Sequence, residues 1–265
     1  MKEADNVRPI VMTIAGLDPS GAAGILADAR TIIALGCYPV AVTTAITFQN
    51  AAGVSGFVAH DSDNLRGQLL PVFNGLKVSA VKTGMMPTRE IVHEVGRTLR
   101  EYQIPAVVID PVMKSSSGYP LMNDDALAEL GDSLLPLASV VTPNVPEAER
   151  LVGFPIRDEE AMRRAAESIR ALGVKAILIK GGHLDAASEI IDVLDDDDEV
   201  TVFRSERIRN GEFRGTGCAL ASAIAACLAQ GHSLKASVGQ AREFVLEAMN
   251  EGVRIGGKRI LFKTS

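Results

Sequence analysis

The chain has 265 residues, of which 47% are hydrophobic and 23% charged, a composition typical of a globular protein with a sizeable core. The formal net charge of -6 argues against nucleic-acid binding, because nucleic-acid-binding proteins normally present a basic surface. The three cysteines are widely spaced and follow no metal-ligand pattern, so we expect a reducing compartment and no disulfides. The N-terminus has no signal-peptide pattern and no apolar run approaches the ~20 residues that span a bilayer, which favours a cytoplasmic protein with no membrane segment.

Apolar, strand-like runs alternate with helix-like periodic segments along the chain. Strands are predicted at residues 10–15, 40–46, 78–82, 106–109, 139–142, 176–180, 189–194 and 200–203. Helices are predicted at residues 25–35, 63–76, 88–101, 124–135, 146–151 and 158–172, with two more after Gly217. Such repeated strand–helix–strand units predict a mostly parallel sheet covered by helices on both faces, in a single α/β domain over residues 1–265.

The most informative segment is Gly215-Thr216-Gly217-Cys218, which is followed by a run of small apolar residues. Glycine lets a ligand approach the backbone closely, and the first N–H groups of a helix lie at the positive end of its dipole. The segment therefore predicts a phosphate-binding site, with Cys218 in a first turn that favours the thiolate. The alternative is a glycine-rich loop that leads into a closely packed helix with a core cysteine.

Polar residues also follow other predicted strands, and ligands of open α/β sheets bind at the carboxyl ends of strands. Asn144 and Glu147 are three residues apart where a strand gives way to a helix, a spacing that suits one Mg²⁺ but equally suits a helix capping box. Lys180 precedes two glycines, so it is either a polyphosphate ligand beside exposed N–H groups or an ordinary lysine at a strand end. Asp110 is a further candidate acid.

Other patterns point away from common sites. Residues 252–258 match the glycine and lysine spacing of a P-loop, but Arg259 stands where Ser or Thr should bind magnesium, so we do not expect a P-loop there. The acidic run at 195–199 is predicted to be a solvated hairpin tip.

Asp28 and Gln49 form a candidate substrate-binding pair. The Asp28 carboxylate accepts hydrogen bonds, whereas the Gln49 carboxamide both donates and accepts them, so together they could recognise an aminopyrimidine edge. The alternative is a solvated polar pair.

Taken in chain order, these motifs resemble the hydroxymethylpyrimidine/phosphomethylpyrimidine kinases of thiamine biosynthesis, within the ribokinase superfamily. The resemblance runs from about residue 11 to residue 240 and rests on Thr13-Ile14-Ala15-Gly16, Asp18-Pro19-Ser20-Gly21, Ala27-Asp28, Gln49-Asn50, Lys82-Thr83-Gly84-Met85, Asp110-Pro111-Val112-Met113, Thr142-Pro143-Asn144, Pro146-Glu147-Ala148, Lys180-Gly181-Gly182-His183 and Gly215-Thr216-Gly217-Cys218. It implies a three-layer α/β/α ribokinase-like fold. It also implies transfer of the ATP γ-phosphate to 4-amino-5-hydroxymethyl-2-methylpyrimidine, and then to the resulting monophosphate.

The resemblance assigns a role to each matching position. The pyrimidine pocket would be lined by Gly16, Ala23, Asp28, Gln49, Met85 and Val112. Mg²⁺ would be served by Asn144 and Glu147, and the nucleotide phosphates by Lys180 and Thr216. The anion hole would consist of Gly215, Thr216 and Gly217, and Cys218 takes the position where sugar kinases of the superfamily carry an aspartate base. A homodimer is implied as well.

The chain also departs from the family pattern. Leu17 stands where a small polar residue is usual, Ala22 where glycine is usual, and Arg214 where a histidine usually precedes the Gly-Thr-Gly-Cys motif. The usual lysine two residues before Gly118 is missing, although Lys114 could partly replace it. Two alternative functions remain open: a pyridoxal or pyridoxine kinase, against which Gln49 argues, and a non-catalytic pyrimidine- or nucleotide-binding protein.

Overall fold

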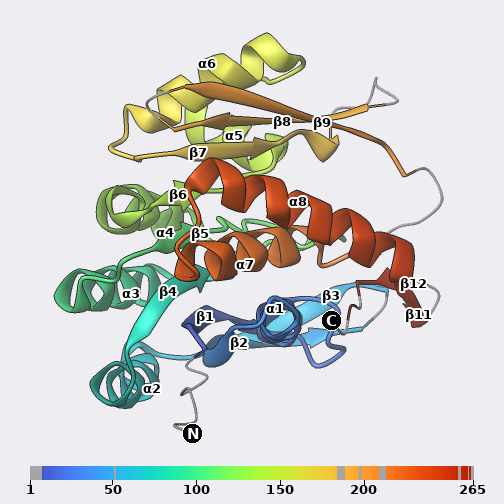
Figure 1. The fold of residues 1–265 in the computed structure, drawn as a ribbon. Coiled ribbons are helices and arrows are strands. Elements are labelled where there is room, and N and C mark those ends of the chain that lie inside the picture. Colours follow the sequence, from blue (N-terminus) through green and yellow to red (C-terminus); the bar gives the residue numbers. More distant parts are fainter. Residues whose placement is uncertain are drawn as a thin grey trace, which may run out of the picture.

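The computed structural model describes residues 8–50, 52–183, 189–196, 199–208, 213–255, 258–261 and 263 (Figure 1). Within these residues the central sheet has nine strands in the order β3-β2-β1-β4-β5-β6-β7-β8-β9. The strands are Ile10–Leu17 (β1), Tyr38–Gln49 (β2), Val54–Ala59 (β3), Val78–Thr83 (β4), Val107–Ile109 (β5), Val140–Val141 (β6), Ile177–Lys180 (β7), Glu189–Asp195 (β8) and Val200–Glu206 (β9). The pairs β2–β3, β7–β8 and β8–β9 are antiparallel and all others are parallel.

Helices cover both faces of this sheet. One face packs against Ser62–Gly75 (α2), Arg89–Tyr102 (α3), Asp124–Glu129 (α4), Val145–Val152 (α5) and Glu159–Arg170 (α6). The other face packs against Gly24–Ala34 (α1), Thr216–Ala229 (α7) and Leu234–Glu251 (α8), and Figure 1 shows α7 and α8 crossing the middle of the sheet. This arrangement confirms the expected three-layer α/β/α fold with a mostly parallel sheet.

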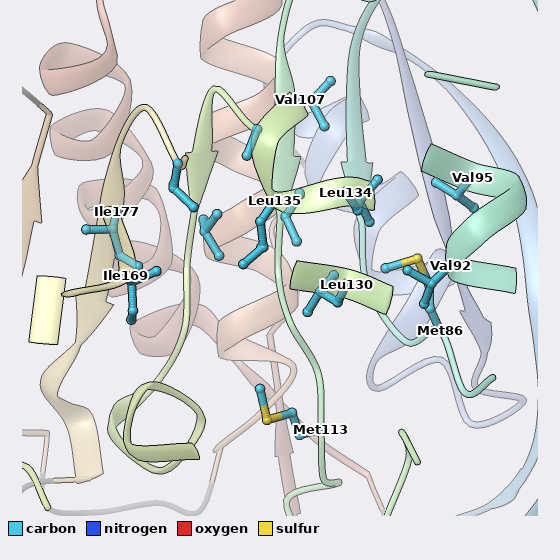
Figure 2. Close-up of a cluster of buried hydrophobic side chains, with 14 of the residues drawn as sticks. Met86, Val92, Val95, Val107, Met113, Leu130, Leu134, Leu135, Ile169 and Ile177 are labelled. Carbon is cyan, nitrogen blue, oxygen red and sulfur yellow. The ribbon is translucent and has the colours of Figure 1, made fainter. Parts of the chain in front are cut away.

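The two cores follow from the period-two alternation of side chains along each buried strand. In β5, Val107 and Ile109 enter the core beneath α2–α6, whereas Val108 enters the core beneath α1, α7 and α8. Figure 2 shows part of the first core, which extends from side chains of α3 through residues 130–135 to Ile169 and Ile177. Because both faces of the central strands are buried, their sequences are almost continuously apolar, as is typical of parallel sheets.

Helix α7 is built from small residues because it lies between the sheet and α8. Its alanines at positions 221, 223, 225 and 226 are fully buried. Small side chains let a helix approach its neighbours closely, and α7 contacts the strands β1, β4 and β5 on one side and α8 on the other.

The structure differs from the predicted elements in three places. The helix predicted at 124–135 is α-helical only to Glu129 and continues as a π-helical turn (Leu130–Leu134) and a 3-10 turn (Leu135–Leu137), which bury Leu130, Leu134 and Leu135 completely. The edge strand β3 was not predicted, since its exposed side and Gly56 weaken the strand pattern. Three short strands, Phe213–Arg214 (β10), Val253–Ile255 (β11) and Lys258–Ile260 (β12), were also missed and form a second sheet in the order β10-β12-β11.

This second sheet explains the P-loop-like spacing. The segment forms the antiparallel strands β11 and β12 rather than a strand–loop–helix, which agrees with the prediction that it is no P-loop. The acidic run behaves only partly as predicted. It does connect two antiparallel strands, but Asp195 ends β8, is buried, and pairs with Arg170 at 2.7 Å instead of being solvated; Asp197 and Asp198 lie outside the described residues.

Candidate active site

A cavity of about 720 Å³ opens at the carboxyl ends of the parallel strands. Residues of the predicted sites that line it are Ala23, Gln49, Val112, Asn144, Glu147, Lys180, Gly215, Thr216, Gly217 and Cys218. These residues come from six separate segments of the chain, and the parallel sheet brings them together because its strands all end at the same edge. The volume is within the range of small-molecule and cofactor sites.

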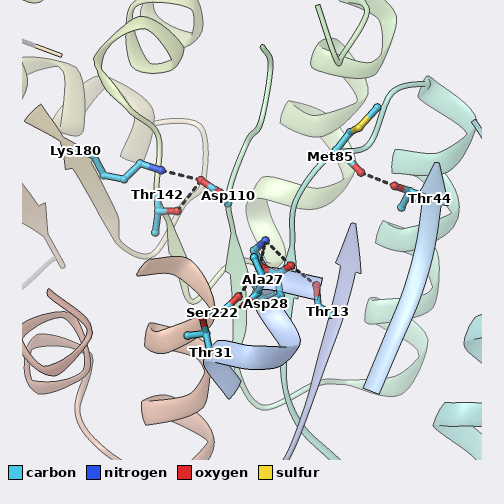
Figure 3. Close-up of polar contacts among 11 residues, drawn as sticks. Thr13, Ala27, Asp28, Thr31, Thr44, Met85, Asp110, Thr142, Lys180 and Ser222 are labelled. Atoms are coloured by element: carbon cyan, nitrogen blue, oxygen red, sulfur yellow. Dashed lines mark hydrogen bonds and ion pairs between the residues drawn. The ribbon is translucent and has the colours of Figure 1, made fainter. Parts of the chain in front are cut away.

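Lys180 and Asp110 form the charged centre of the cavity. The Lys180 Nζ lies 2.8 Å from Asp110 Oδ1, which also accepts a hydrogen bond from Thr142 Oγ1 at 3.3 Å (Figure 3). Burial lowers the pKa of Lys180, but the charges of Asp110 and Glu147 outweigh this effect and raise the pKa above its ordinary value. The lysine therefore carries its charge at neutral pH, beside the helix that begins at Thr216.

The glycines at the start of α7 are required by the geometry. Gly215 has φ +82°, in the left-handed region, and a Cβ at this position would lie 2.2 Å from the carbonyl oxygen of Ala22. A Cβ on Gly217 would lie 3.3 Å from Lys180 Nζ. The backbone therefore comes close to the lysine, and the first N–H groups of α7 lie at the cavity wall, which is the arrangement expected for an anion hole.

Asn144 and Glu147 form the capping box that the sequence left as an alternative. Asn144 Oδ1 accepts a hydrogen bond from the Glu147 N–H, and Glu147 Oε2 accepts one from the Asn144 N–H, both at 2.9 Å. Burial, together with the charge of Asp110, raises the pKa of Glu147 to about 7, against the opposing effect of Lys180. A buried carboxylate that is destabilised in this way is suited to a nearby cation.

The cluster fits a magnesium ion that is held largely by water and by substrate. Within the described residues no group of three or more His, Cys, Asp or Glu side chains is arranged to enclose a metal. Mg²⁺, however, usually keeps several waters and binds one or two carboxylates together with substrate phosphates. The oxygens of Asp110, Asn144 and Glu147 supply donors of that kind at one side of the cavity.

Cys218 lies at the cavity wall in the first turn of α7, as predicted, but its pKa is shifted in the opposite direction. Burial raises the pKa of the thiol to about 11, and the charge of Lys82 and a hydrogen bond from the Gly24 backbone only partly oppose this. The expectation of a thiolate stabilised by the helix N-terminus is therefore wrong for this structure. The reason is that removing the sulfur from water, together with the nearby Asp28 and Asp110, disfavours the anion.

Asp28 does not line the cavity, so its predicted contact with the pyrimidine is corrected as well. Its carboxylate is fully buried and accepts hydrogen bonds from Thr13 Oγ1 at 2.6 Å and Ser222 Oγ at 2.8 Å (Figure 3). It also forms an ion pair with Lys82 Nζ at 2.9 Å, and both side chains have zero exposure. This network joins β1, α1, β4 and α7 directly behind the anion hole, so Asp28 supports the site from within the core.

Gln49 is held in one orientation at the other end of the cavity. Its Nε2 donates to Asp18 Oδ2 at 2.7 Å, and its Oε1 lies 3.3 Å from Thr47 Oγ1, a hydroxyl group whose shorter contact, 3.0 Å, is with the Leu17 carbonyl oxygen. The second oxygen of Asp18 accepts hydrogen bonds from the N–H and hydroxyl of Ser20. The sequence analysis quoted Asp18 as part of the Asp18-Pro19-Ser20-Gly21 motif but did not select it as a site residue.

Gly16 and Met85 lie one layer behind this end of the cavity. Neither lines the cavity wall, but Met85 packs with Val112 and with the cavity residue Leu121. A Cβ on Gly16 would lie 2.9 Å from the Met85 sulfur, so the glycine leaves room for that side chain. These two residues therefore shape the apolar wall from behind, whereas Val112 and Ala23 lie on its surface.

Two further residues of the cavity were missed as site candidates. Arg242 on α8 pairs with Asp192 at 2.8 Å, and the other oxygen of Asp192 accepts a hydrogen bond from the Gly181 N–H at 3.0 Å. The pair thereby connects α8 to the glycine turn that follows Lys180. No local motif indicated this contact, because the two residues are fifty positions apart and meet only through the packing of α8 against β8 and β9.

Comparison with known proteins agrees with this geometry. The family model for phosphomethylpyrimidine kinase matches residues 18–262. A hydroxymethylpyrimidine/phosphomethylpyrimidine kinase of Streptomyces coelicolor is 43% identical over 249 residues, which are 94% of this chain and 91% of the relative. A thiamine biosynthesis bifunctional protein of Geobacter sulfurreducens is also 43% identical over 94% of this chain, but the chain spans only 51% of that longer relative.

Solved structures of a phosphomethylpyrimidine kinase and of a pyridoxal kinase have folds similar to that of this chain. The crystal structure of a phosphomethylpyrimidine kinase from Clostridium difficile matches with a TM-score of 0.81 and 38% identity, covering 91% of this chain and 99% of that one. A pyridoxal kinase from Staphylococcus aureus, solved with AMP-PCP and pyridoxal, matches with a TM-score of 0.89 and 30% identity, covering 97% and 94% of the two chains. Fold, site and sequence together show that this chain belongs to the phosphomethylpyrimidine kinase family.

Proposed function

We propose that the protein transfers the γ-phosphate of ATP to the hydroxymethyl group of 4-amino-5-hydroxymethyl-2-methylpyrimidine, and a second phosphoryl group to the monophosphate so formed. The observation that carries this proposal is the approach of Lys180 to the glycine-flanked N-terminus of α7, within a cavity whose other end holds an oriented Gln49. A cation and backbone N–H groups suit the transferred phosphoryl group, and an oriented carboxamide suits an aminopyrimidine.

The acceptor oxygen attacks the γ-phosphorus as the bond to the β–γ bridging oxygen breaks, and ADP leaves. In a loose transition state the hydroxyl group keeps its proton until late, so positioning and charge stabilisation provide most of the catalysis. The proton can pass to an oxygen of the transferred phosphate, which requires no thiolate. Because the resting Cys218 is a neutral thiol, its role in this proposal is to position the hydroxymethyl group at the anion hole.

Magnesium would supply the charge neutralisation that the nucleotide phosphates require. Asn144, Glu147 and Asp110 would hold it, through oxygens and bound water, on the side of the cavity next to Lys180. Lys180 and the N–H groups of Thr216 and Gly217 would then bind the phosphate chain from the opposite side.

We also retain three broader predictions: one domain over residues 1–265, a cytoplasmic location and a homodimer. For the dimer, exposed apolar side chains of the β2–β3 hairpin, including Tyr38, Phe48 and Val58, are the candidate contact surface. Within the described residues no helix is both long and apolar enough to cross a membrane. Sedimentation equilibrium of the wild type and of a Phe48→Ser variant would test the assembly.

The similarity to pyridoxal kinases supports one alternative acceptor. A coupled ADP-release assay with the pyrimidine alcohol, its monophosphate and pyridoxal compares the candidates directly. We expect the alcohol to be preferred, and Gln49→Met to reduce its use by about 5- to 150-fold, because the buried polar edge of the pyrimidine would lose its partner. Preferred use of pyridoxal would refute the assignment, and no ADP release with any acceptor would favour a non-catalytic binding protein.

A control separates the carboxamide contact from general damage to the pocket. The Thr47→Val variant removes the hydroxyl group that lies between the Leu17 carbonyl oxygen (3.0 Å) and Gln49 Oε1 (3.3 Å), but it leaves the carboxamide and its bond to Asp18 in place. We expect a smaller loss than with Gln49→Met. Equal losses of pyrimidine and pyridoxal activity in Gln49→Met would show that the residue is structural.

A further inference from the structure

Arg214 is a nearly buried cation at the junction between the two ends of the cavity. The residue is 7% exposed and lines the cavity, immediately before the anion-hole residue Gly215. Its Nη1 donates a hydrogen bond to the carbonyl oxygen of Asn50, which follows Gln49 at the end of β2. Arg214 is therefore attached to the end of the cavity that holds Gln49, whereas Lys180 and Arg242 lie at the other end with the glycine turn.

The ionic environment of Arg214 differs from that of three other cations of the cavity wall. Lys180 pairs with Asp110, Arg242 with Asp192 and Arg150 with Asp124. Among the residues that the structure describes, Arg214 has no carboxylate within ion-pair distance, and its one hydrogen bond is to a neutral carbonyl group. Buried charges are normally paired, so a guanidinium with unused donors at a cavity wall indicates a site for an anion.

The position of Arg214 identifies which anion. A pyrimidine ring that lies between Gln49 and Val112 must direct its hydroxymethyl group to the N-terminus of α7, where the phosphoryl group is transferred. If the acceptor already carries a phosphate, that phosphate lies between the ring and the anion hole, next to Arg214. An arginine binds phosphate oxygens through two parallel hydrogen bonds and keeps its charge at any working pH.

We propose that Arg214 binds the phosphate of the monophosphorylated acceptor and is a specificity-determining residue for the second phosphoryl transfer. Its positive charge would offset the repulsion between the acceptor phosphate and the γ-phosphate of ATP. The inference rests on the proposed function, because it concerns the second of the two transfers. The same guanidinium chemistry would suit the γ-phosphate itself, and the experiment below distinguishes the two phosphates.

The test measures kcat and KM separately for the pyrimidine alcohol, its monophosphate and ATP in the wild type, Arg214→Met and Arg214→Lys. Hydrogen bonds to charged groups correspond to about 10- to 150-fold in affinity. We therefore expect Arg214→Met to lower kcat/KM for the monophosphate by that factor, with a loss at least tenfold smaller for the alcohol. Arg214→Lys, which keeps the charge but not the paired donors, should recover part of the activity with the monophosphate.

A matched control is Lys77→Met, which removes an exposed cation that does not line the cavity. We expect it to affect the alcohol and the monophosphate to the same small extent. Calorimetric titration of the monophosphate without nucleotide gives an independent reading: Arg214→Met should weaken its binding, whereas ADP binding by the same variant should match the wild type. Circular dichroism tests whether each variant is folded. If Arg214→Met does not fold, the comparison of the two acceptors is made with Arg214→Lys.

The outcomes are distinct. Equal losses with both acceptors, a raised KM for ATP, or unchanged binding of the monophosphate would each overturn the assignment of Arg214. A wild-type protein that phosphorylates the alcohol but not the monophosphate would also overturn it while leaving the first transfer intact. If the wild type phosphorylates neither acceptor, the proposed function fails, and the calorimetric comparison still decides whether Arg214 binds the phosphate.

Discussion

The buried ion pair behind the anion hole allows a quantitative prediction. In Lys82→Met the side-chain volume is nearly kept, but Asp28 loses a partner that lies 2.9 Å away at zero exposure. Removing one member of a buried pair costs about 3–5 kcal/mol, because it leaves an uncompensated charge in the core. In the wild type the attraction of Asp28 outweighs the effect of burial and raises the pKa of Lys82, so the charged pair is the native state.

We expect the free energy of unfolding of Lys82→Met to fall by about 3–5 kcal/mol. At about 2–4 °C per kcal/mol, Tm should fall by roughly 6–20 °C. The hydrogen bonds from Thr13 and Ser222 still stabilise the Asp28 carboxylate, which favours the lower end of this range. Urea denaturation followed by circular dichroism is the suitable assay, since the chain has no tryptophan whose fluorescence could be followed.

The double variant Asp28→Asn/Lys82→Met separates charge from packing. Asparagine removes the carboxylate charge and keeps one acceptor oxygen for either Thr13 or Ser222, and the other hydroxyl group can accept from the new NH2 group. The double variant should therefore be more stable than Lys82→Met alone. A loss below about 1 kcal/mol in Lys82→Met would refute the reasoning, as the charge would then not depend on its partner. A double variant that is as unstable as the sum of the two single changes would show that packing, and not the ion pair, decides the cost.

Three further predictions concern residues of the cavity itself. The pKa of Glu147 is about 7 in the folded protein and about 4.5 when unfolded, so its contribution to stability is complete below pH 4.5 and is lost as pH rises through 7. Glu147→Gln should therefore flatten this part of the stability–pH curve and lower magnesium-dependent turnover. A stability difference between wild type and variant that does not change with pH would contradict this prediction. Because the pKa of Cys218 is about 11, the rate of its alkylation by iodoacetamide should rise about tenfold per pH unit between pH 7 and 9, and bound ATP with acceptor should protect the thiol. Fast labelling of Cys218 at pH 7, mapped by mass spectrometry, would show that the thiolate is present. Gly215→Ala forces a Cβ to 2.2 Å from the Ala22 carbonyl oxygen at φ +82°. We expect a variant that still folds but no longer binds ATP in calorimetric titration. Binding with wild-type affinity would exclude the proposed anion hole.

Local patterns were sufficient for most of the architecture. The strands β1, β4, β5 and β7 are apolar runs ended by polar or glycine residues, and helices such as α3 and α6 have a clear periodic face. These signals lie within single segments, so they can be recognised without a tertiary context. The short strands β10, β11 and β12 carry no such signal, because two or three residues are too few to show a period. The pairing of β10 with β12 also joins Phe213 to Arg259, 46 residues later.

The site followed the same division. The sequence by itself determined which residue types stand at the strand ends and at the start of α7, and the parallel sheet necessarily gathers those ends at one edge. Lys180, Gln49, Gly215 and Gly217 accordingly line one cavity, and their roles in it stay predictions. Burial and side-chain partners depend on what packs around a residue, and only the tertiary structure decided them. It placed Lys82 against Asp28, surrounded Cys218 closely enough to raise its pKa, and left Arg214 without a carboxylate at the cavity wall. The physical reason is that the free energy of a charged or polar group is set by desolvation and by atoms within a few ångströms, and in this fold those atoms come from distant parts of the chain.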